Sequence, residues 1–204
     1  MVILNNNPVV TPNKSTKNIS FAYLTEQFFL NTKTFKYPHE ILDITKTSEE
    51  RAARTYTLVL IEVKGLTILI PLRSGNKDLI GNVNLNGCFF RVPTEKRNNA
   101  ILDYRKAIIV SPGDYILDNA RIAYNQKKQI SDNLGNIQLE FFSYFEEFLN
   151  AFDQEQKLII NNPKNRDRYL KSALKNYLPL KEIEEYTNIS KDINYEDDKL
   201  VLKN

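Results

Sequence analysis

The chain of 204 residues is long enough for one domain with a buried core, and its 26% of charged residues is ordinary for a soluble globular protein. A formal net charge of +3 permits a polyanionic partner without requiring one. The single cysteine excludes an internal disulfide and a multi-cysteine zinc site, and the single histidine excludes catalysis by a histidine pair within the chain. No apolar run reaches the roughly 20 residues of a membrane span, and the start lacks a signal-peptide pattern, so we expect a cytoplasmic protein.

The first part of the chain predicts a flexible arm followed by a helix. Residues 1–18 are polar, with three consecutive asparagines, and are typical of an arm. Apolar residues then recur at Phe21, Leu24 and Phe28, which predicts a helix over 19–30 with Ser20 available as its N-cap. A short helical turn is expected over 40–44, and His39 just before it is interpreted as a surface or capping residue.

A β-hairpin is the clearest structural pattern in the sequence. Residues 55–63 are β-branched, aromatic and apolar, Lys64-Gly65 marks a turn, and residues 66–72 form the returning strand. Short strands are also expected over 88–92, where Cys88 reads as a small core residue, and over 106–110.

The second half of the chain predicts helices. Apolar residues at helical spacing indicate a long amphipathic helix over 127–153, and a basic helix is expected over about 165–177. The order of helix, strands and then helices predicts an α+β fold with an antiparallel sheet. We expect one domain over 19–180, with residues 181–204 as an extension.

The segment Arg73-Ser74-Gly75-Asn76-Lys77 directly follows the returning strand of the hairpin. Cleavage of a phosphodiester without a metal ion needs cations for the phosphate oxygens, polar donors that hold the phosphate, and a group that moves a proton. Arginine, serine and lysine supply these three functions. Considered alone, the pattern favours an ordinary basic loop at a strand end, because such loops are common.

Two further segments carry a family resemblance. The first is the run from Arg54 through Tyr56 to Pro71-Leu72-Arg73-Ser74, and the second is Ile101-Leu102-Asp103-Tyr104 with Lys106-Ala107-Ile108-Ile109-Val110. With the aromatic-rich stretch over 130–152, these segments resemble the toxins of type III toxin–antitoxin systems, the ToxN, TenpN and AbiQ group, and most of all its TenpN branch. The resemblance covers residues 54 to about 150.

This resemblance implies a compact, strongly curved antiparallel sheet with flanking helices, like the barrel of small ribonuclease toxins. It implies metal-independent RNA cleavage by attack of the 2′-hydroxyl, leaving a 2′,3′-cyclic phosphate and a 5′-hydroxyl, with no cofactor. It also implies an antitoxin made of repeated, pseudoknot-like RNA, which the toxin cuts into units and holds in a closed RNA–protein assembly. Cellular or phage RNA would be the substrate, and neither DNA nor a membrane would be a partner.

Individual roles follow from the matched positions. Ser74 matches the family's active-site serine, Arg73 is expected to contact the phosphate, and Lys77 is a match to a loop lysine. Residues expected near the RNA are Arg54, Tyr56, Asn76 and Lys106, and Asp103 is expected to orient either Lys106 or Arg73. Lys106 is almost equally consistent with a lysine that merely flanks a buried strand.

A basic stretch outside the resemblance offers two interpretations. Helical spacing would bring Arg168, Lys171 and Lys175 near one face, where they would contact RNA phosphates. The same residues are equally consistent with the solvated side of a helix that packs its apolar residues inward. For the whole chain, the main alternative to the toxin is a non-catalytic RNA-binding phage-defence protein. A protein-interaction domain that docks through residues 127–153 ranks last.

Overall fold

The computed structural model describes residues 20–42, 47, 58–63, 66–74, 77–111, 113–117, 122–152, 158–159, 163–178, 193–196 and 199–202. The predicted arm over 1–18 lies outside these residues, as do Arg54, Tyr56 and Asn76. None of the helices within the described ranges has both the length and the apolar character needed to cross a membrane.

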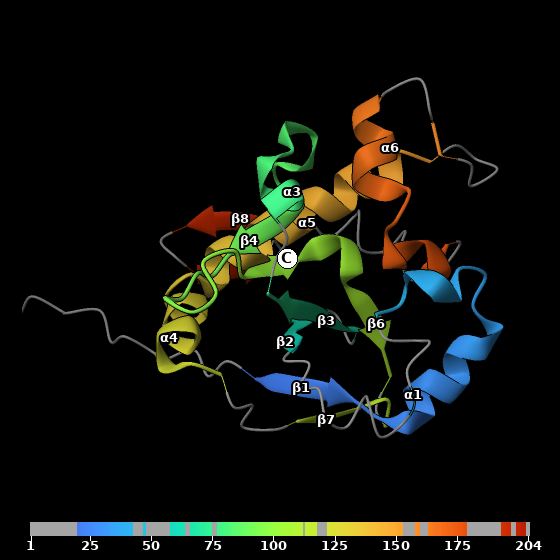
Figure 1. Ribbon diagram of the computed structural model, residues 1–204, viewed down its shortest axis with the longest axis horizontal. Coiled ribbons are helices and arrows are strands. Elements are labelled where there is room, and N and C mark those ends of the chain that lie inside the picture. Colours follow the sequence, from blue (N-terminus) through green and yellow to red (C-terminus); the bar gives the residue numbers. More distant parts are fainter. Residues whose placement is uncertain are drawn as a thin grey trace, which may run out of the picture.

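An antiparallel sheet organises the described part of the chain (Figure 1). Its strand order is β4-β5-β3-β2-β1-β7, and β6 also pairs with β3. Figure 1 shows β1 and β7 at one end of the molecule and α6 at the other. The strands are β1 Phe21–Leu24, β2 Leu58–Val63, β3 Leu66–Arg73, β4 Phe89–Arg91, β5 Ile101–Asp103, β6 Ile108–Val110 and β7 Tyr115–Leu117. A separate pair is formed by β8 Ile193–Glu196 and β9 Lys199–Leu202.

The predicted hairpin is confirmed, and its second strand is the centre of the sheet. β2 and β3 pair from Val63 opposite Leu66 to Leu58 opposite Pro71. On its other edge β3 pairs first with β6, through Thr67–Leu69, and then with β5, through Leu72 and Arg73. Pro71 has no N–H to donate, and it falls where this edge changes partner, so a proline is tolerated inside a central strand.

A single turn of 3-10 helix, η4 Tyr104–Lys106, separates β5 from β6. The carboxylate of Asp103 begins this turn by accepting the backbone N–H of Arg105. The turn sends consecutive side chains in different directions, because Arg105 turns back to Asp103 and Lys106 reaches Glu40.

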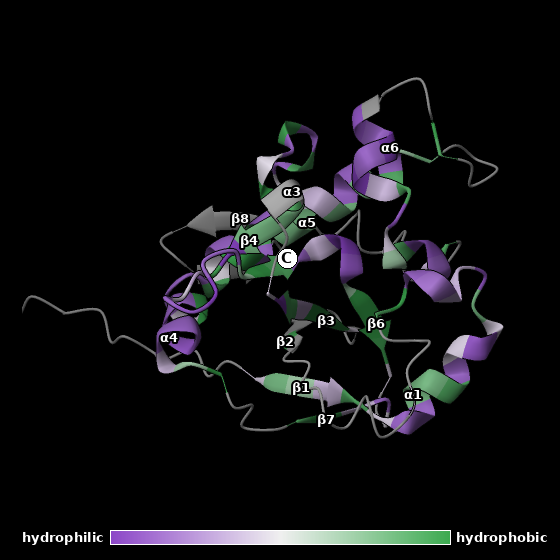
Figure 2. Cartoon of the chain, viewed as in Figure 1, coloured by the Kyte–Doolittle hydropathy of each residue, from purple (hydrophilic) through white to green (hydrophobic). Residues whose placement is uncertain are grey.

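Helices surround the sheet. The α-helices are α1 Glu26–Asn31, α3 Lys77–Gly81, α4 Tyr124–Asp132, α5 Leu134–Asn150 and α6 Pro163–Tyr169. Short 3-10 helices are η1 Thr32–Thr34, η2 Pro38–Glu40, η3 Val83–Leu85 and η5 Ala173–Tyr177. Figure 2 shows β6 as hydrophobic and α4 as largely hydrophilic, in line with one buried and one solvated element.

The long helix α5 packs one apolar face against the core. Its buried residues follow the spacing of one helical stripe, and they are Ile137, Phe141, Tyr144, Phe145 and Phe148. The predicted helix over 127–153 is therefore confirmed in its main part. It is wrong in its continuity, because Asn133 leaves the helical conformation at φ −115° and ψ 14° and divides α4 from α5.

Two other helix predictions are corrected. The helix expected over 19–30 begins as strand β1, because this segment pairs with β2 on one side and β7 on the other; Thr25, not Ser20, caps the helix that follows. The basic helix expected over 165–177 divides into α6 and η5, and Ser172 caps the second piece. The turn near residue 40 is η2, which begins at Pro38.

Candidate functional site

The candidate site lies where β3 ends. Arg73 is the last residue of β3 and pairs with Ile101 of β5, and Asp103 lies two residues further along the same strand. Residues two apart on a strand share a face, so the two side chains meet. The Arg73 Nη1 atom lies 2.5 Å from Asp103 Oδ2. Of the two partners expected for Asp103, the structure brings it to Arg73.

Asp103 is fully buried and also holds a second arginine. Its Oδ1 accepts from Nε of Arg105 at 3.2 Å, and its Oδ2 accepts from Nη2 of Arg105 at 3.2 Å. The side chain of Arg105 is 8% exposed, whereas that of Arg73 is 33% exposed. Arg105 thus holds the carboxylate from the buried side. On the more exposed side, Oδ2 of the same carboxylate also accepts a hydrogen bond from Arg73.

The charges of this cluster do not cancel. Two guanidinium groups face one carboxylate, which leaves one positive charge in excess. Burial acts to lower the pKa of Arg105, but the charge and hydrogen bonds of Asp103 outweigh it and raise the pKa above its usual value. Arg105 therefore stays charged and neutralises Asp103. The partly exposed Arg73 consequently keeps a positive charge that can attract an anion.

Ser74 follows Arg73 and is exposed. Within the part of the chain that the structure describes, its hydroxyl group makes no hydrogen bond. Lys77 begins α3, so the backbone turns into a helix three residues after Ser74. Arginine, serine and the first residue of α3 thus come from one short stretch at the end of a central strand. Asn76 lies outside the described residues, and so do Arg54 and Tyr56, which precede β2.

Lys106 is part of a different cluster, which we call the Glu40 clasp and which consists of Glu40, Lys106 and Lys175. The Lys106 Nζ atom donates to Glu40 Oε2 at 2.9 Å, to the Glu40 carbonyl at 3.0 Å and to the Lys171 carbonyl at 2.8 Å. These contacts use all three of its donors. Burial lowers the pKa of Lys106, and Glu40 offsets only part of this effect. Lys106 joins η2, η4 and the segment before η5 rather than pointing at Asp103.

Lys175 and Arg168 are also engaged inside the protein. Lys175 donates to the Leu170 carbonyl, lies 3.5 Å from Glu40 Oε1 and sits 4.3 Å above the ring of Tyr37. Both residues are buried, so neither interpretation of the basic stretch, an exposed phosphate-binding face or the solvated side of a helix, holds for them. Lys171 is exposed.

Arg168 connects three elements of the fold through hydrogen bonds and an ion pair. Its Nη1 donates to the Asn86 carbonyl at 2.6 Å, and its Nη2 lies 2.7 Å from Glu147 Oε2 on α5. Its Nε donates to the hydroxyl of Tyr169 at 3.1 Å. A buried cation needs such partners, and their presence explains why an arginine of the basic stretch faces inward.

The single cysteine and the single histidine behave as expected from the sequence. Cys88 is fully buried, and burial raises the pKa of its thiol to about 11, which suppresses the reactive thiolate. His39 lies on the surface, 3.4 Å from Glu40 Oε1. Across the described residues, no three side chains of His, Cys, Asp or Glu gather in a way that would hold a metal ion.

Sequence reasoning missed Arg105 and Glu40. Arg105 stands two residues after Asp103, and this spacing at a strand end is a signal for an aspartate that caps a turn and pairs with the following arginine. Glu40 gives no comparable signal, because its partner Lys106 is 66 residues away in the sequence.

No protein-family model matches the chain, and no curated protein matches it. Among solved structures, one concerns a processed non-coding RNA that regulates a bacterial antiviral system; it is 15% identical, with a TM-score of 0.48, over 72% of this chain and 97% of that chain. Another concerns selective toxin inhibition by a non-coding RNA pseudoknot in bacterial type III toxin–antitoxin systems; it is 12% identical, with a TM-score of 0.41, over 83% of this chain and 98% of that chain.

Proposed function

We propose that this chain is a metal-independent endoribonuclease, the toxin of a type III toxin–antitoxin system, with its active site at Arg73 and Ser74. One observation carries the proposal. The guanidinium of Arg73 is fixed at the end of β3 by a buried aspartate whose charge a second arginine already neutralises, beside an exposed serine. The resemblance of residues 54 to about 150 to type III toxins supports the same assignment.

The reaction would use the surplus positive charge of this cluster. The 2′-oxygen of the substrate attacks the adjacent phosphorus, passes its proton to solvent water and forms the cyclic phosphate, while the bond from phosphorus to the 5′-oxygen breaks and that oxygen takes up a proton. Negative charge builds on the nonbridging oxygens, where Arg73 would stabilise it and Ser74 would donate a hydrogen bond. We assign Lys77, at the start of α3, as the proton donor to the leaving 5′-oxygen.

Asp103 acts as a positioning residue in this scheme, because it is fully buried and would act on a substrate only through Arg73. Holding the guanidinium in one orientation lowers the entropy lost when it binds a phosphate. The inhibitor of the enzyme would be a repeated, structured RNA that the protein processes and binds in a closed assembly. The cellular target would be host or phage RNA in the cytoplasm.

The decisive experiment is cleavage of RNA by the purified protein in the presence of EDTA, with the ends of the products determined by mass spectrometry. We expect cleavage that survives the chelator and yields 2′,3′-cyclic phosphate and 5′-hydroxyl ends. Strict dependence on a metal ion would overturn the mechanism. RNA binding without any cleavage would favour the non-catalytic RNA-binding protein instead.

One test variant and one control variant make the result specific. Arg73→Ala removes the proposed phosphate contact, and Lys33→Ala removes the same charge from an exposed position on η1. Only the first variant should lose cleavage. A tandem repeat in the DNA just upstream of the reading frame would independently support the RNA antitoxin.

A further inference from the structure

The turn η4 is attached to the rest of the fold by three consecutive side chains. Tyr104 donates from its hydroxyl to a carboxylate of α5 at 3.2 Å. Arg105 binds Asp103, and Lys106 binds Glu40 at the end of η2. Tyr104 is fully buried, and the side chains of Arg105 and Lys106 are 8% and 13% exposed. The position of this turn therefore depends on three separate interior contacts, one of which is the Glu40 clasp.

The Glu40 clasp is itself held firmly by the protein. Lys106 uses its three donors within it, two on Glu40 and one on the Lys171 carbonyl. Tyr37, directly before η2, exchanges two hydrogen bonds with Asn176 of η5, one of 2.7 Å from its N–H and one of 3.0 Å to its carbonyl. The end of the Lys106 side chain is thus kept in one place, and so is the last residue of η4.

The same turn sets the orientation of the Asp103 carboxylate. Its Oδ1 accepts both the backbone N–H and Nε of Arg105, each at 3.2 Å. Its Oδ2 accepts from Nη2 of Arg105 and from Nη1 of Arg73. Because Arg105 contacts both oxygens, the carboxylate cannot turn without breaking these bonds unless Arg105 moves with it. A displacement of η4 would therefore change the direction in which Arg73 points.

The charges of the two clusters also interact. Burial lowers the pKa of Lys106 most, and Glu40 raises it. Asp103 also raises this pKa and Arg105 lowers it, so both lie close enough for their charges to act on Lys106. Arg73 is the most exposed charged side chain of the two clusters, at 33%. The contacts that begin at Glu40 in the interior thus end at the member that is most open to an anion.

We propose that Glu40 and Lys106 are positioning residues for the candidate active site. The clasp holds η4, η4 holds Arg105, and Arg105 orients the carboxylate that aims Arg73 at the phosphate. This role gives Lys106 a part in the reaction without any contact with RNA. The effect on cleavage rests on the proposed function, whereas the coupling between the clasp and Asp103 does not. Aim matters because a misplacement of about 1 Å can cost on the order of 100-fold in rate.

The first test measures this coupling without RNA. The Nε–H of Arg105 bonds to Asp103, so its hydrogen exchange, followed by NMR of isotope-labelled protein, reports on that contact directly. Lys106→Met keeps the length of the side chain but removes its donors, and should speed this exchange at least about 10-fold. The amides of Thr67–Leu69 in β3 should keep their rates, because they report on opening of the sheet.

Two results of this test would overturn the proposal. One is an unchanged exchange rate at Arg105, and the other is an equal increase at Thr67–Leu69, which would mean that the whole domain is destabilised. Glu40→Gln should act in the same direction and more weakly, because the amide oxygen still accepts from Lys106. This milder variant is judged by the same two results, and it decides the matter if Lys106→Met does not fold.

The second test is a double-mutant cycle on RNA cleavage, measured in single turnover at saturating protein with EDTA present. Lys106→Met should lower the maximal rate about 10- to 100-fold and leave the half-saturating concentration within about twofold. In the Arg73→Ala background the same substitution should change the rate less than about twofold, because no guanidinium remains to be aimed. An equal loss in both backgrounds would overturn the proposal. A loss confined to the half-saturating concentration would overturn it in favour of direct RNA contact by Lys106.

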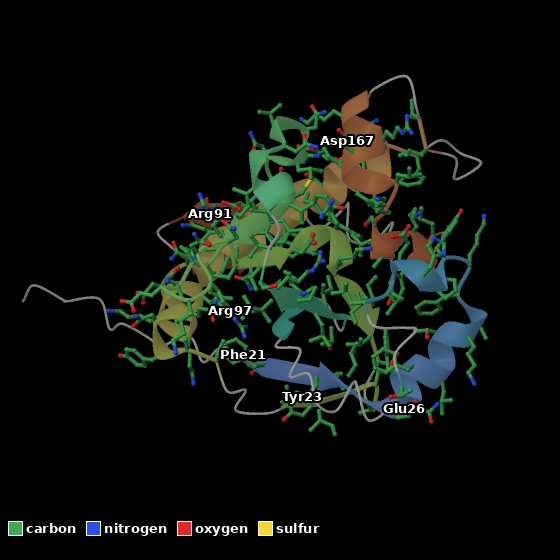
Figure 3. All side chains as sticks on the ribbon, viewed as in Figure 1. Phe21, Tyr23, Glu26, Arg91, Arg97 and Asp167 are labelled. Carbon is green, nitrogen blue, oxygen red and sulfur yellow. The ribbon has the colours of Figure 1, made fainter. Side chains whose placement is uncertain are left out.

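Two control variants remove a like charge from exposed positions. They are Lys33→Met on η1 and Glu95→Gln in the loop between β4 and β5. Figure 3 shows Arg97, two residues after Glu95, on the opposite side of the molecule from Glu26 of α1. Both controls should keep the exchange and cleavage rates of the parent protein. A response as large as that of Lys106→Met would overturn the proposal, because a general effect of charge would then explain both.

Failure of this proposal is distinguishable from failure of the proposed function. If the parent protein cleaves no RNA, the nuclease assignment is lost, and the exchange at Arg105 alone decides whether the clasp holds Asp103. A protein that cleaves RNA with chelator present, but whose Arg105 exchange ignores Lys106→Met, keeps its nuclease assignment and loses the positioning role of the clasp.

Discussion

Replacing Asp103 with asparagine separates the structural from the functional role of the arginines around it. Asparagine keeps the shape of the side chain but removes the charge that compensates Arg105, which is only 8% exposed. Removing one partner of a buried ion pair costs about 3–5 kcal/mol. For a chain of this size, that corresponds to a fall of about 6–20 °C in the melting temperature.

Arg73→Met should behave differently, although Arg73 contacts the same carboxylate. Its side chain is 33% exposed, so water screens the ion pair, and Asp103 keeps Arg105 as a partner. We expect a loss of at most about 1 kcal/mol in the free energy of unfolding. Arg105→Met, which leaves Asp103 buried with only the partly exposed arginine, should resemble Asp103→Asn.

Urea denaturation followed by circular dichroism measures all three variants, and RNA cleavage is assayed under conditions where each is folded. We expect Arg73→Met to be stable and inactive, and Asp103→Asn to be destabilised. Equal destabilisation by Arg73→Met and Arg105→Met would refute the reasoning, because Arg73 would then serve the fold rather than the site. An Asp103→Asn protein as stable as the wild type would refute the buried network itself.

Three further predictions concern the site and the Glu40 clasp. Ser74→Ala should relieve growth inhibition in cells without changing the circular dichroism spectrum, and full toxicity of this variant would exclude Ser74 from the site. Arg73→Ala should reduce cleavage by about 2–4 kcal/mol of transition-state stabilisation, or roughly 30- to 900-fold, and single-turnover rates within a few-fold of wild type would count against a phosphate contact. Burial raises the pKa of Glu40, but Lys106 and Lys175 outweigh this effect and hold it below its usual 4.5. The stability that Glu40 contributes is therefore present above that pH and is lost as the pH falls through the lower folded-state pKa. Urea titrations between about pH 3 and pH 7 should show that the free energy of unfolding falls less steeply toward acid pH in Glu40→Gln than in the wild type. Identical pH dependence of the two proteins would contradict the clasp.

The hairpin β2–β3 was predictable because its residues are β-branched and apolar over two adjacent runs with a clear turn between them. β1 was not predictable, since its partners lie tens of residues away on β2 and β7 and its four residues also fit a helical stripe. The break at Asn133 was missed for a related reason. The apolar spacing continues across it, so periodicity alone gives no sign of two helices.

The site was predictable in part. Arg73 and Ser74 stand out because they follow a strongly predicted strand, and the contact of Arg73 with Asp103 agrees with one of the two partners expected. The roles of Arg168 and Lys175 could not be predicted from the sequence. Nothing in the sequence around a basic residue indicates that it will be buried beside a carboxylate from a distant part of the chain. Burial of a cation depends on tertiary partners, whereas the charge pattern reports only on the residue itself.

The position of β3 has a consequence for the motions of the protein. Thr67–Leu69 pair with β2 on one edge and β6 on the other, so each of their amide hydrogens can exchange with solvent only when β3 separates from the neighbour to which that amide is bonded. Arg73 belongs to the same strand, whereas β7 lies at the end of the strand order and can open by itself. We therefore expect the candidate site to remain assembled through local openings at the sheet edge, and RNA cleavage in rising denaturant to persist until the whole domain unfolds.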